Sequence, residues 1–313
     1  MNRRAGAVAR AGALARGLVA LWLLCLPAFA LHAADASSAA TAPATGEWHS
    51  FWSVKGRHNT VWLLGSVHLL QPAGSAPTPQ VLRAYADSSG LVMELDLARV
   101  GPDAMLGQNL TLLTLPDGQT LRGVLGSDAH DRFVRAAKPL GVDPEFMSRF
   151  QPWFAAMTFE QLLYARQGYD ALSGVDQQFA KLAAADGKPV IGLETIDEQL
   201  GFFSSMTAAE QRDLLLQTID DAAGGEALLA STVEAWRRGD TRALEALLRD
   251  GRDKSPALFR RLTTDRNQRW MTRLLPLLEA RENYMVVVGA LHLVGNDGLV
   301  KLLERQGYRP VQH

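Results

Sequence analysis

Two apolar runs that lie far apart in the chain end in the same way. Residues 61–70 read VWLLGSVHLL and residues 286–295 read VVVGALHLVG, so each run stops at a glycine and continues to a histidine three positions on. Short apolar runs of this kind are typical of buried strands. In open α/β sheets, ligands gather beyond the carboxyl ends of the strands. The pattern predicts that His68 and His292 lie beyond strand ends, in one crevice if the strands are parallel neighbours.

Helical patterns separate the apolar runs and indicate the fold class. A hairpin is expected over residues 48–65, a helix from near Thr78 and a strand at Leu91–Leu95. The other expected elements are strands at 188–193 and 284–288, a closing helix at 297–307, a last short strand at 308–312, and mostly helical stretches at 102–187 and 207–281. Four or five strands separated by helices predict an α/β fold. Its core is a mixed β-sheet flanked by helices, with two long helical insertions.

The N-terminus has the pattern of an export signal. Four arginines precede an apolar stretch that ends in small residues, as in a secretory signal peptide. The expected organisation is a signal peptide at 1–34, a linker at 35–46 and an α/β domain at 47–313. An uncleaved membrane anchor is the alternative, but Pro27 and the polar residues after it leave the apolar run short. We therefore expect a periplasmic or secreted protein that meets the membrane only if the segment stays attached.

The composition restricts the chemistry that is available. A net charge of −1, without a Gly-rich phosphate loop or a dense basic patch, gives no reason to expect a nucleic-acid partner. The only cysteine is Cys25, inside the signal segment. A processed chain would have no thiol, so its chemistry must come from histidines, carboxylates, hydroxyls or a metal held by nitrogen and oxygen ligands. The composition does not indicate an oligomeric state.

Glu94 is the third member of the candidate site. It follows three apolar residues, where a carboxylate is costly unless it is paired, protonated or bound to a metal. Two histidines and one glutamate form a known ligand set for catalytic zinc and related divalent ions. The plainer alternatives are that each histidine is a structural residue and that Glu94 caps a helix or forms a salt bridge. Asp96 could compete with Glu94 for its role.

Two further charged residues occur in suggestive positions. Glu194 also ends an apolar strand and so could face the same crevice, although a carboxylate at a helix N-terminus is an equally good interpretation. Arg266 lies in a helical stretch and could reach a substrate carbonyl or oxyanion. Most helical arginines, however, are solvated or paired with an acid.

Taken together, these motifs resemble the TraB/GumN family, whose animal relatives are the Tiki proteases. The resemblance covers residues 48–311 and rests on the order of its motifs: GSVH (65–68), MELD (93–96), GVDQQF (174–179), GLETIDEQ (192–199), Arg266-Asn267 with Met271, and GALH (289–292). The departures are GVD in place of the usual GLD and an aspartate before the Arg-Asn pair.

The resemblance implies the α/β fold shared with erythromycin esterases and haem-binding ChaN-like proteins. It also implies a metal site at His68, Glu94 and His292, supported by Arg266 and Glu194. Tiki proteins cleave peptide bonds with manganese or cobalt, so Mn²⁺ or Co²⁺ is expected, and the donor set also suits Zn²⁺. The leading hypothesis is an exported metallohydrolase acting on a peptide or another small molecule.

Two other functions compete with this hypothesis. One is a non-catalytic periplasmic binding protein that captures a peptide signal, haem or glycan in the same crevice. The other is a metal-free esterase in which a histidine acts as the general base.

Overall fold

The computed structural model describes residues 48–98, 110–143, 145–222 and 225–313. The expected signal peptide at 1–34 and the linker at 35–46 lie outside these residues. Within the described ranges, no helix is both long enough and apolar enough to cross a membrane.

A six-stranded mixed sheet forms the centre of the structure, with the strand order β4-β3-β5-β2-β1-β6. The strands are β1 (Phe51–Lys55), β2 (Thr60–Ser66), β3 (Gly90–Met93), β4 (Val190–Gly192), β5 (Tyr284–Gly289) and β6 (Val311–Gln312). Strands β4, β3, β5 and β2 run parallel, and β1 is antiparallel to both β2 and β6. The expected mixed α/β sheet is confirmed, and the condition that β2 and β5 be parallel neighbours is met.

The two long helical insertions are also confirmed. The first lies between β3 and β4 and contains α5 (Leu110–Leu113), α6 (Leu121–Leu125), α7 (Ser127–Ala137), α8 (Pro152–Ala165) and α9 (Val175–Asp186). The second lies between β4 and β5 and contains α10 (Ile196–Ser204), α11 (Ala208–Asp221), α12 (Gly225–Arg237), α13 (Thr241–Lys254), α14 (Pro256–Phe259) and α15 (Asp265–Glu279). The described residues also form α3 (Pro79–Asp87), which Thr78 caps, and α16 (Leu299–Arg305).

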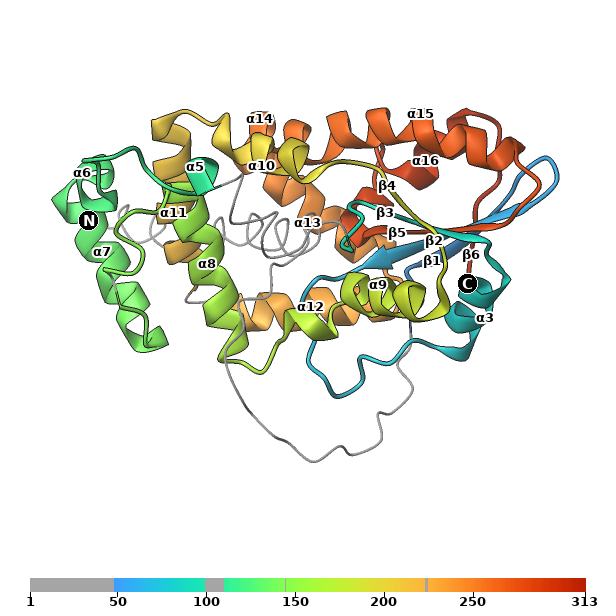
Figure 1. Cartoon of the computed structure of the whole chain (residues 1–313), viewed down its shortest axis with the longest axis horizontal. Coiled ribbons are helices and arrows are strands. Elements are labelled where there is room, and N and C mark those ends of the chain that lie inside the picture. The colour runs from blue at the N-terminus through green and yellow to red at the C-terminus, as the bar shows by residue number, and fades with distance from the viewer. Residues whose placement is uncertain (1–47, 99–109, 144, 223–224) are drawn as a thin grey trace, which may run out of the picture.

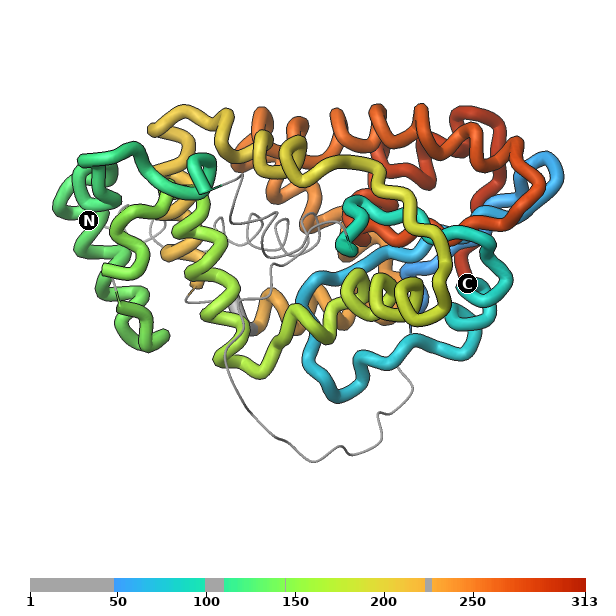
Figure 2. Tube along the Cα trace, in the orientation of Figure 1, coloured from blue at the N-terminus to red at the C-terminus, as the bar shows by residue number. Residues whose placement is uncertain are grey.

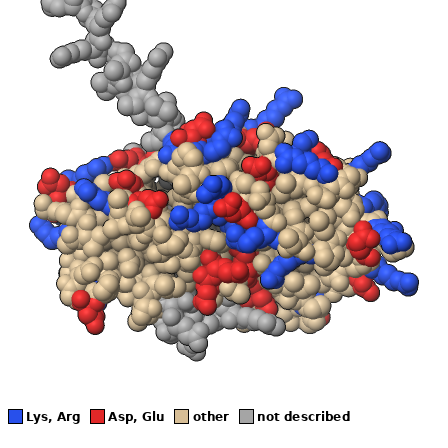
Figure 3. Space-filling view, turned by 90° about the horizontal axis from the view of Figure 1, so that it is seen from above, with Lys and Arg blue, Asp and Glu red and all other residues tan. Residues whose placement is uncertain are grey.

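Helices cover both faces of the sheet. In Figure 1, α15 and α16 lie on one side, and α3 and α9 lie on the other. Helices α6, α7, α8 and α11 form a separate group at the end of the molecule opposite β6, as the tube in Figure 2 also shows. Basic and acidic side chains are interspersed over the face seen in Figure 3. The sheet therefore forms one end of the domain, and the insertions build a helical layer beyond it.

Trp236 ties the second insertion to the first hairpin. Its indole Nε1 donates to the carbonyl of Gly65 at 2.7 Å, and its own carbonyl accepts from the hydroxyl of Ser50 at 2.8 Å. The ring is fully buried and lies 5.2 Å from the ring of Trp48. These contacts hold α12 against the end of β2, immediately before the first histidine motif.

Replacing Trp236 with phenylalanine should therefore destabilise the fold. The change removes a buried hydrogen bond and part of a buried ring, and we expect the free energy of unfolding to fall by about 1–3 kcal/mol. The matched control is Trp62→Phe, because the Nε1 of Trp62 has no hydrogen-bond partner. Urea unfolding of both variants checks the prediction, and equal losses would contradict it.

Candidate functional site

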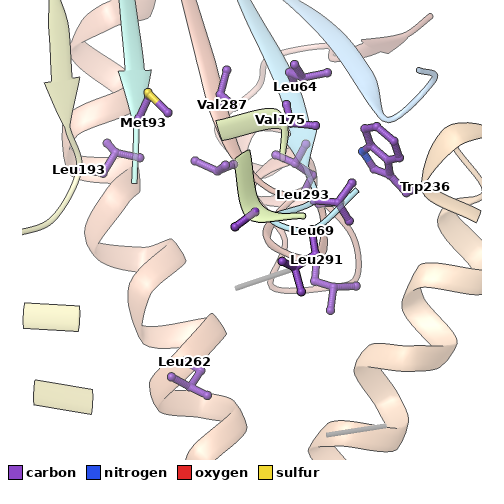
Figure 4. Close-up of a cluster of buried hydrophobic side chains, with 14 of the residues drawn as sticks. Leu64, Leu69, Met93, Val175, Leu193, Trp236, Leu262, Val287, Leu291 and Leu293 are labelled. Carbon is purple, nitrogen blue, oxygen red and sulfur yellow. The ribbon is translucent and has the colours of Figure 1, made fainter. Parts of the chain in front are cut away.

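Four parallel strands each bring one chemically active residue to the same edge of the sheet. His68 follows β2, Glu94 follows β3, Glu194 follows β4 and His292 follows β5. All four side chains are buried. The neighbours of these residues are apolar, and Figure 4 shows them gathered at the strand ends: Leu69, Met93, Leu193, Leu291 and Leu293. The strand ends therefore form a polar centre with apolar walls.

Arg266 connects three of these four residues. Its Nη2 donates to Oε2 of Glu94 at 2.5 Å and to Oε2 of Glu194 at 2.8 Å, while its Nε donates to Glu194 at 3.0 Å. Its Nη1 lies 3.1 Å from Nε2 of His292. The side chain has no exposed surface. Arg266 is thus an ion-paired buried cation at the centre of the site.

The helix that carries Arg266 begins with an unusual turn. Residues Arg260–Thr264 form a π-helical turn directly before α15, and Nη1 of Arg266 donates to the carbonyl of Leu262 at 3.2 Å. The guanidinium also lies over the rings of Trp270 and Phe202, at 4.7 and 5.4 Å from their centroids. Single π-helical turns inside helices are frequent at functional sites. Here the turn and the two rings fix the direction of the guanidinium.

The surroundings of His292 define its tautomer. Its Nδ1 lies 2.7 Å from Oδ1 of Asn267, whose Nδ2 donates to the carbonyls of His292 and Asp297. The amide oxygen of Asn267 must therefore accept a hydrogen bond from the N–H at Nδ1. Burial, the Arg266 guanidinium and His68 lower the pKa of His292 well below its usual range. His292 is thus neutral, with its lone pair on Nε2.

His68 is held in a similar way by Asp176. Its Nδ1 donates to Oδ2 of Asp176 at 2.6 Å, and its buried Nε2 has no hydrogen-bond partner. Burial opposes a charged imidazole, but the attraction and hydrogen bond of Asp176 outweigh it, so the pKa of His68 is raised. An Asp–His pair with an open Nε2 is the arrangement of a general base and also of a metal-binding histidine.

Close backbone packing places Asp176 beside His68. The N–H of Val175 donates to the carbonyl of Val67 at 3.0 Å, where α9 begins. A Cβ on Gly174 would lie 2.3 Å from the carbonyl oxygen of His68, so only glycine fits at this position. The first turn of α9 therefore rests on the backbone of the histidine motif, and Asp176 in that turn reaches the ring.

Glu94 and Glu194 share further partners. Glu94 Oε1 accepts from the backbone N–H of Gly289 at 2.8 Å, and burial raises the pKa of Glu94 despite its pairing with Arg266. Gln199 donates to both carboxylates, at 3.4 and 3.3 Å. Arg269, whose side chain is 48% exposed, reaches Glu194 at 3.2 Å from the outside. The raised pKa of Glu94 suits this carboxyl to proton transfer.

The donor atoms of the site suit a divalent ion in their chemistry. Both histidines keep the Nδ1 proton bonded to an oxygen, which leaves Nε2 for a ligand, and Glu94 Oε1 lies 4.0 Å from Nε2 of His292. Three carboxylates, Glu94, Glu194 and Asp176, face two guanidinium groups and His68, whose pKa is raised beside Asp176. The Nε2 of His68 has no hydrogen-bond partner, which favours a metal ligand at this atom.

The hydrogen bonds of Arg266 also restrict how such an ion could bind. Among the residues that the structure describes, no group of three or more His, Cys, Asp or Glu side chains is arranged to hold a metal ion. Arg266 contacts both His292 Nε2 and Glu94 Oε2. Ligation by these two residues therefore requires the guanidinium to move off them.

The structure brings His68, Glu94, Glu194, Arg266 and His292 together, but not Asp96. Asp96 instead accepts from the backbone N–H of Ala98, and Glu94 is the acid that pairs with Arg266. Glu194 does not cap α10, because Thr195 and Glu198 form a capping box there. The sequence assigned no role to Asp176, Asn267, Gln199 and Arg269. The first three lie within the quoted motifs, but their partners come from distant segments.

A known family matches this chain over residues 50–312, described as the TraB/PrgY/gumN family. The chain belongs to the TraB/PrgY/gumN family. Two relatives illustrate how far the family extends. YbaP of Escherichia coli K12, an uncharacterized protein, is 26% identical over 258 residues, which cover 77% of this chain and 86% of the relative. An uncharacterized protein of Treponema pallidum is 22% identical over 270 residues, which cover 82% of this chain and 80% of the relative. No solved structure matches this family member significantly.

Arg266 should be essential to the stability of this TraB/PrgY/gumN protein. Arg266→Met leaves Glu94 and Glu194 buried without their cation, and we expect a loss of about 3–5 kcal/mol. Arg269→Met removes a half-exposed partner of the same Glu194 and should cost about 0–1 kcal/mol. Denaturant unfolding of both variants provides the measurement.

The pH dependence of the Arg266→Met variant offers a second check. Without the guanidinium, the pKa of the buried Glu94 carboxyl rises further, and folding then favours its protonated form. The variant should therefore recover stability relative to the wild type as the pH falls from 7 towards 5. An unchanged difference over this range would contradict the assigned ion pairs.

Proposed function

We propose that this chain is an exported hydrolase that depends on a divalent metal ion and acts on peptide bonds. The observation that carries the proposal is that both histidines turn their Nε2 atoms to the site, because Asp176 and Asn267 hold their Nδ1 atoms. The Nε2 of His68, which is buried without a hydrogen-bond partner, also supports a metal ligand there. Export rests on the N-terminal sequence pattern.

In this proposal His68, His292 and Glu94 hold the ion, which would be Mn²⁺, Co²⁺ or Zn²⁺. When bound, such an ion lowers the pKa of a water molecule and polarises the scissile carbonyl. Asp176 and Asn267 act as positioning residues, because each fixes the ring orientation and the tautomer of one histidine.

Arg266 and Glu94 supply the remaining chemistry. The Arg266 guanidinium lies between the two strand-end carboxylates and His292, where it offsets negative charge that develops on a carbonyl oxygen. Glu194 and Gln199 orient Arg266 and Glu94 from the far side. The raised pKa of Glu94 suits it to proton transfer, a role that competes with ligation for the same carboxylate.

A second candidate is a hydrolase that works without a metal. The observation in its favour is that Arg266 already bonds Glu94 and His292, while the Nε2 of His68 remains open beside Asp176. His68 would then act as the general base, oriented by Asp176, and Arg266 would stabilise the oxyanion. An ester is the substrate such a site would cleave most readily.

Metal analysis tests the leading proposal. The purified protein should bind about one Mn²⁺ or Co²⁺ per chain, since the ligands form one site, and the His68→Ala/His292→Ala double variant should lose it. His58→Ala is the control, because His58 is exposed and precedes β2, whereas His68 follows the other end of that strand. Elemental analysis after gel filtration gives the stoichiometry, and full metal retention in the double variant would sink the assignment.

Asp176→Asn separates the two candidates. If the site holds a metal, the variant should bind the ion about 10–100-fold more weakly, because His68 loses the carboxylate that orients its ring. Activity on a peptide library should then recover at high Mn²⁺ concentration and vanish on chelation. If the site works without a metal, the activity of the wild type on esters should survive exhaustive chelation. Added Mn²⁺ should then not restore the activity of the variant.

A further inference from the structure

Two buried acids lie in the helical layer, away from the strand ends. Glu160 is in α8 and Asp221 is the last residue of α11, and the two helices pack side by side (Figures 1 and 2). Only 6% of Glu160 and 4% of Asp221 is exposed. Tyr164 stands one turn after Glu160 on the same face of α8 and is fully buried. We call these three residues the α8–α11 acidic site.

The polar atoms of this site lack hydrogen-bond partners. Both carboxylate oxygens of Asp221, Oε1 of Glu160 and the hydroxyl of Tyr164 are buried without one. Leaving such a group unpaired costs about 1–3 kcal/mol, and more when it is charged. Three unsatisfied side chains from two neighbouring helices are therefore a defect unless something bonds to them.

The charges of the site are only partly compensated. Asp221 acts on Glu160 and both acids act on Tyr164, so the three groups are close enough to interact electrostatically. Lys254 of α13 attracts Asp221 but is already paired with Asp250 at 2.7 Å, and Asp250 and Asp220 add further negative charge. The pKa of Glu160 is raised well above its usual range by burial and Asp221, and burial raises the pKa of Asp221 to about 7.

The chemistry of these groups selects one class of ligand. The donors are two carboxylates and a hydroxyl, without nitrogen or sulfur, and such oxygen donors suit Mg²⁺ and Ca²⁺. We propose that the α8–α11 acidic site binds a hard divalent cation, Ca²⁺ or Mg²⁺, through Glu160, Asp221 and the hydroxyl of Tyr164. Water would complete the coordination, as is usual for Mg²⁺ held by one or two carboxylates.

The position of the site gives this cation a structural effect. Helix α8 belongs to the first insertion and α11 to the second, so the ion links two segments that follow different strands. The proposal is independent of the histidine site, whose ligands lie at the strand ends and include nitrogen. A cation that binds only the folded form raises the melting temperature by mass action.

Thermal melting of the purified full-length protein tests the proposal. After chelation and dialysis, Ca²⁺ or Mg²⁺ at about one hundred times its Kd should raise the melting temperature by about 5 °C. The Glu160→Gln/Asp221→Asn variant should lose this rise. Asp213→Asn, which changes an exposed acid of the same helix, and the His68→Ala/His292→Ala variant should both keep it.

A second measurement guards against a variant that simply unfolds. Because the double amide variant removes two buried acids whose oxygens lack hydrogen-bond partners, its melting temperature in chelator should equal or exceed that of the wild type. Isothermal titration should give one cation per wild-type chain and show whether Ca²⁺ or Mg²⁺ binds more tightly. The α8–α11 acidic site is wrong if neither ion raises the melting temperature of the wild type, or if the double amide variant shows the same rise. Either result would leave the proposed metal site at the histidines untouched.

Discussion

A single buried guanidinium holds the candidate site together. Arg266 bonds the acids that follow β3 and β4 and contacts the histidine that follows β5. Desolvating a cation and two carboxylates is costly, and the cost is offset only when the geometry satisfies most of their hydrogen bonds. The π-helical turn before α15, the rings of Trp270 and Phe202, and the amide of Gln199 supply that geometry.

The sheet explains why these groups meet. Four parallel strands, β4, β3, β5 and β2, end at one edge, and a polar residue of the site follows each of them within three residues. The register pairs Ser66 with Gly289, which sets the two histidine motifs side by side. A Cβ on Gly65 would lie 3.0 Å from Ala290, so glycine allows the two motifs to approach closely. The repeated glycine in the sequence thus has a packing role in the first motif.

The helical insertions orient the site rather than merely surround it. Helix α9 carries Asp176 to His68, and α15 carries both Arg266 and Asn267 to His292. Each histidine is thereby oriented by an oxygen from a helix far away in the sequence. Two helices of these insertions, α8 and α11, also bring two buried acids, Glu160 and Asp221, near each other at a distance from the sheet. The same layer therefore positions the strand-end site and carries a second polar cluster.

The sequence by itself determined the fold class, the strands and the strand-end residues. Short apolar runs and polar residues at their ends are local patterns, so His68, Glu94, Glu194 and His292 could be predicted from the periodicity and the strand-end rule. Only the tertiary structure decided that Arg266 pairs with both glutamates, that Asp176 and Asn267 define the histidine tautomers, and that Glu160 meets Asp221. These relations join helices and strands that are distant in the chain. They depend on packing distances and desolvation, which no local pattern of residues encodes.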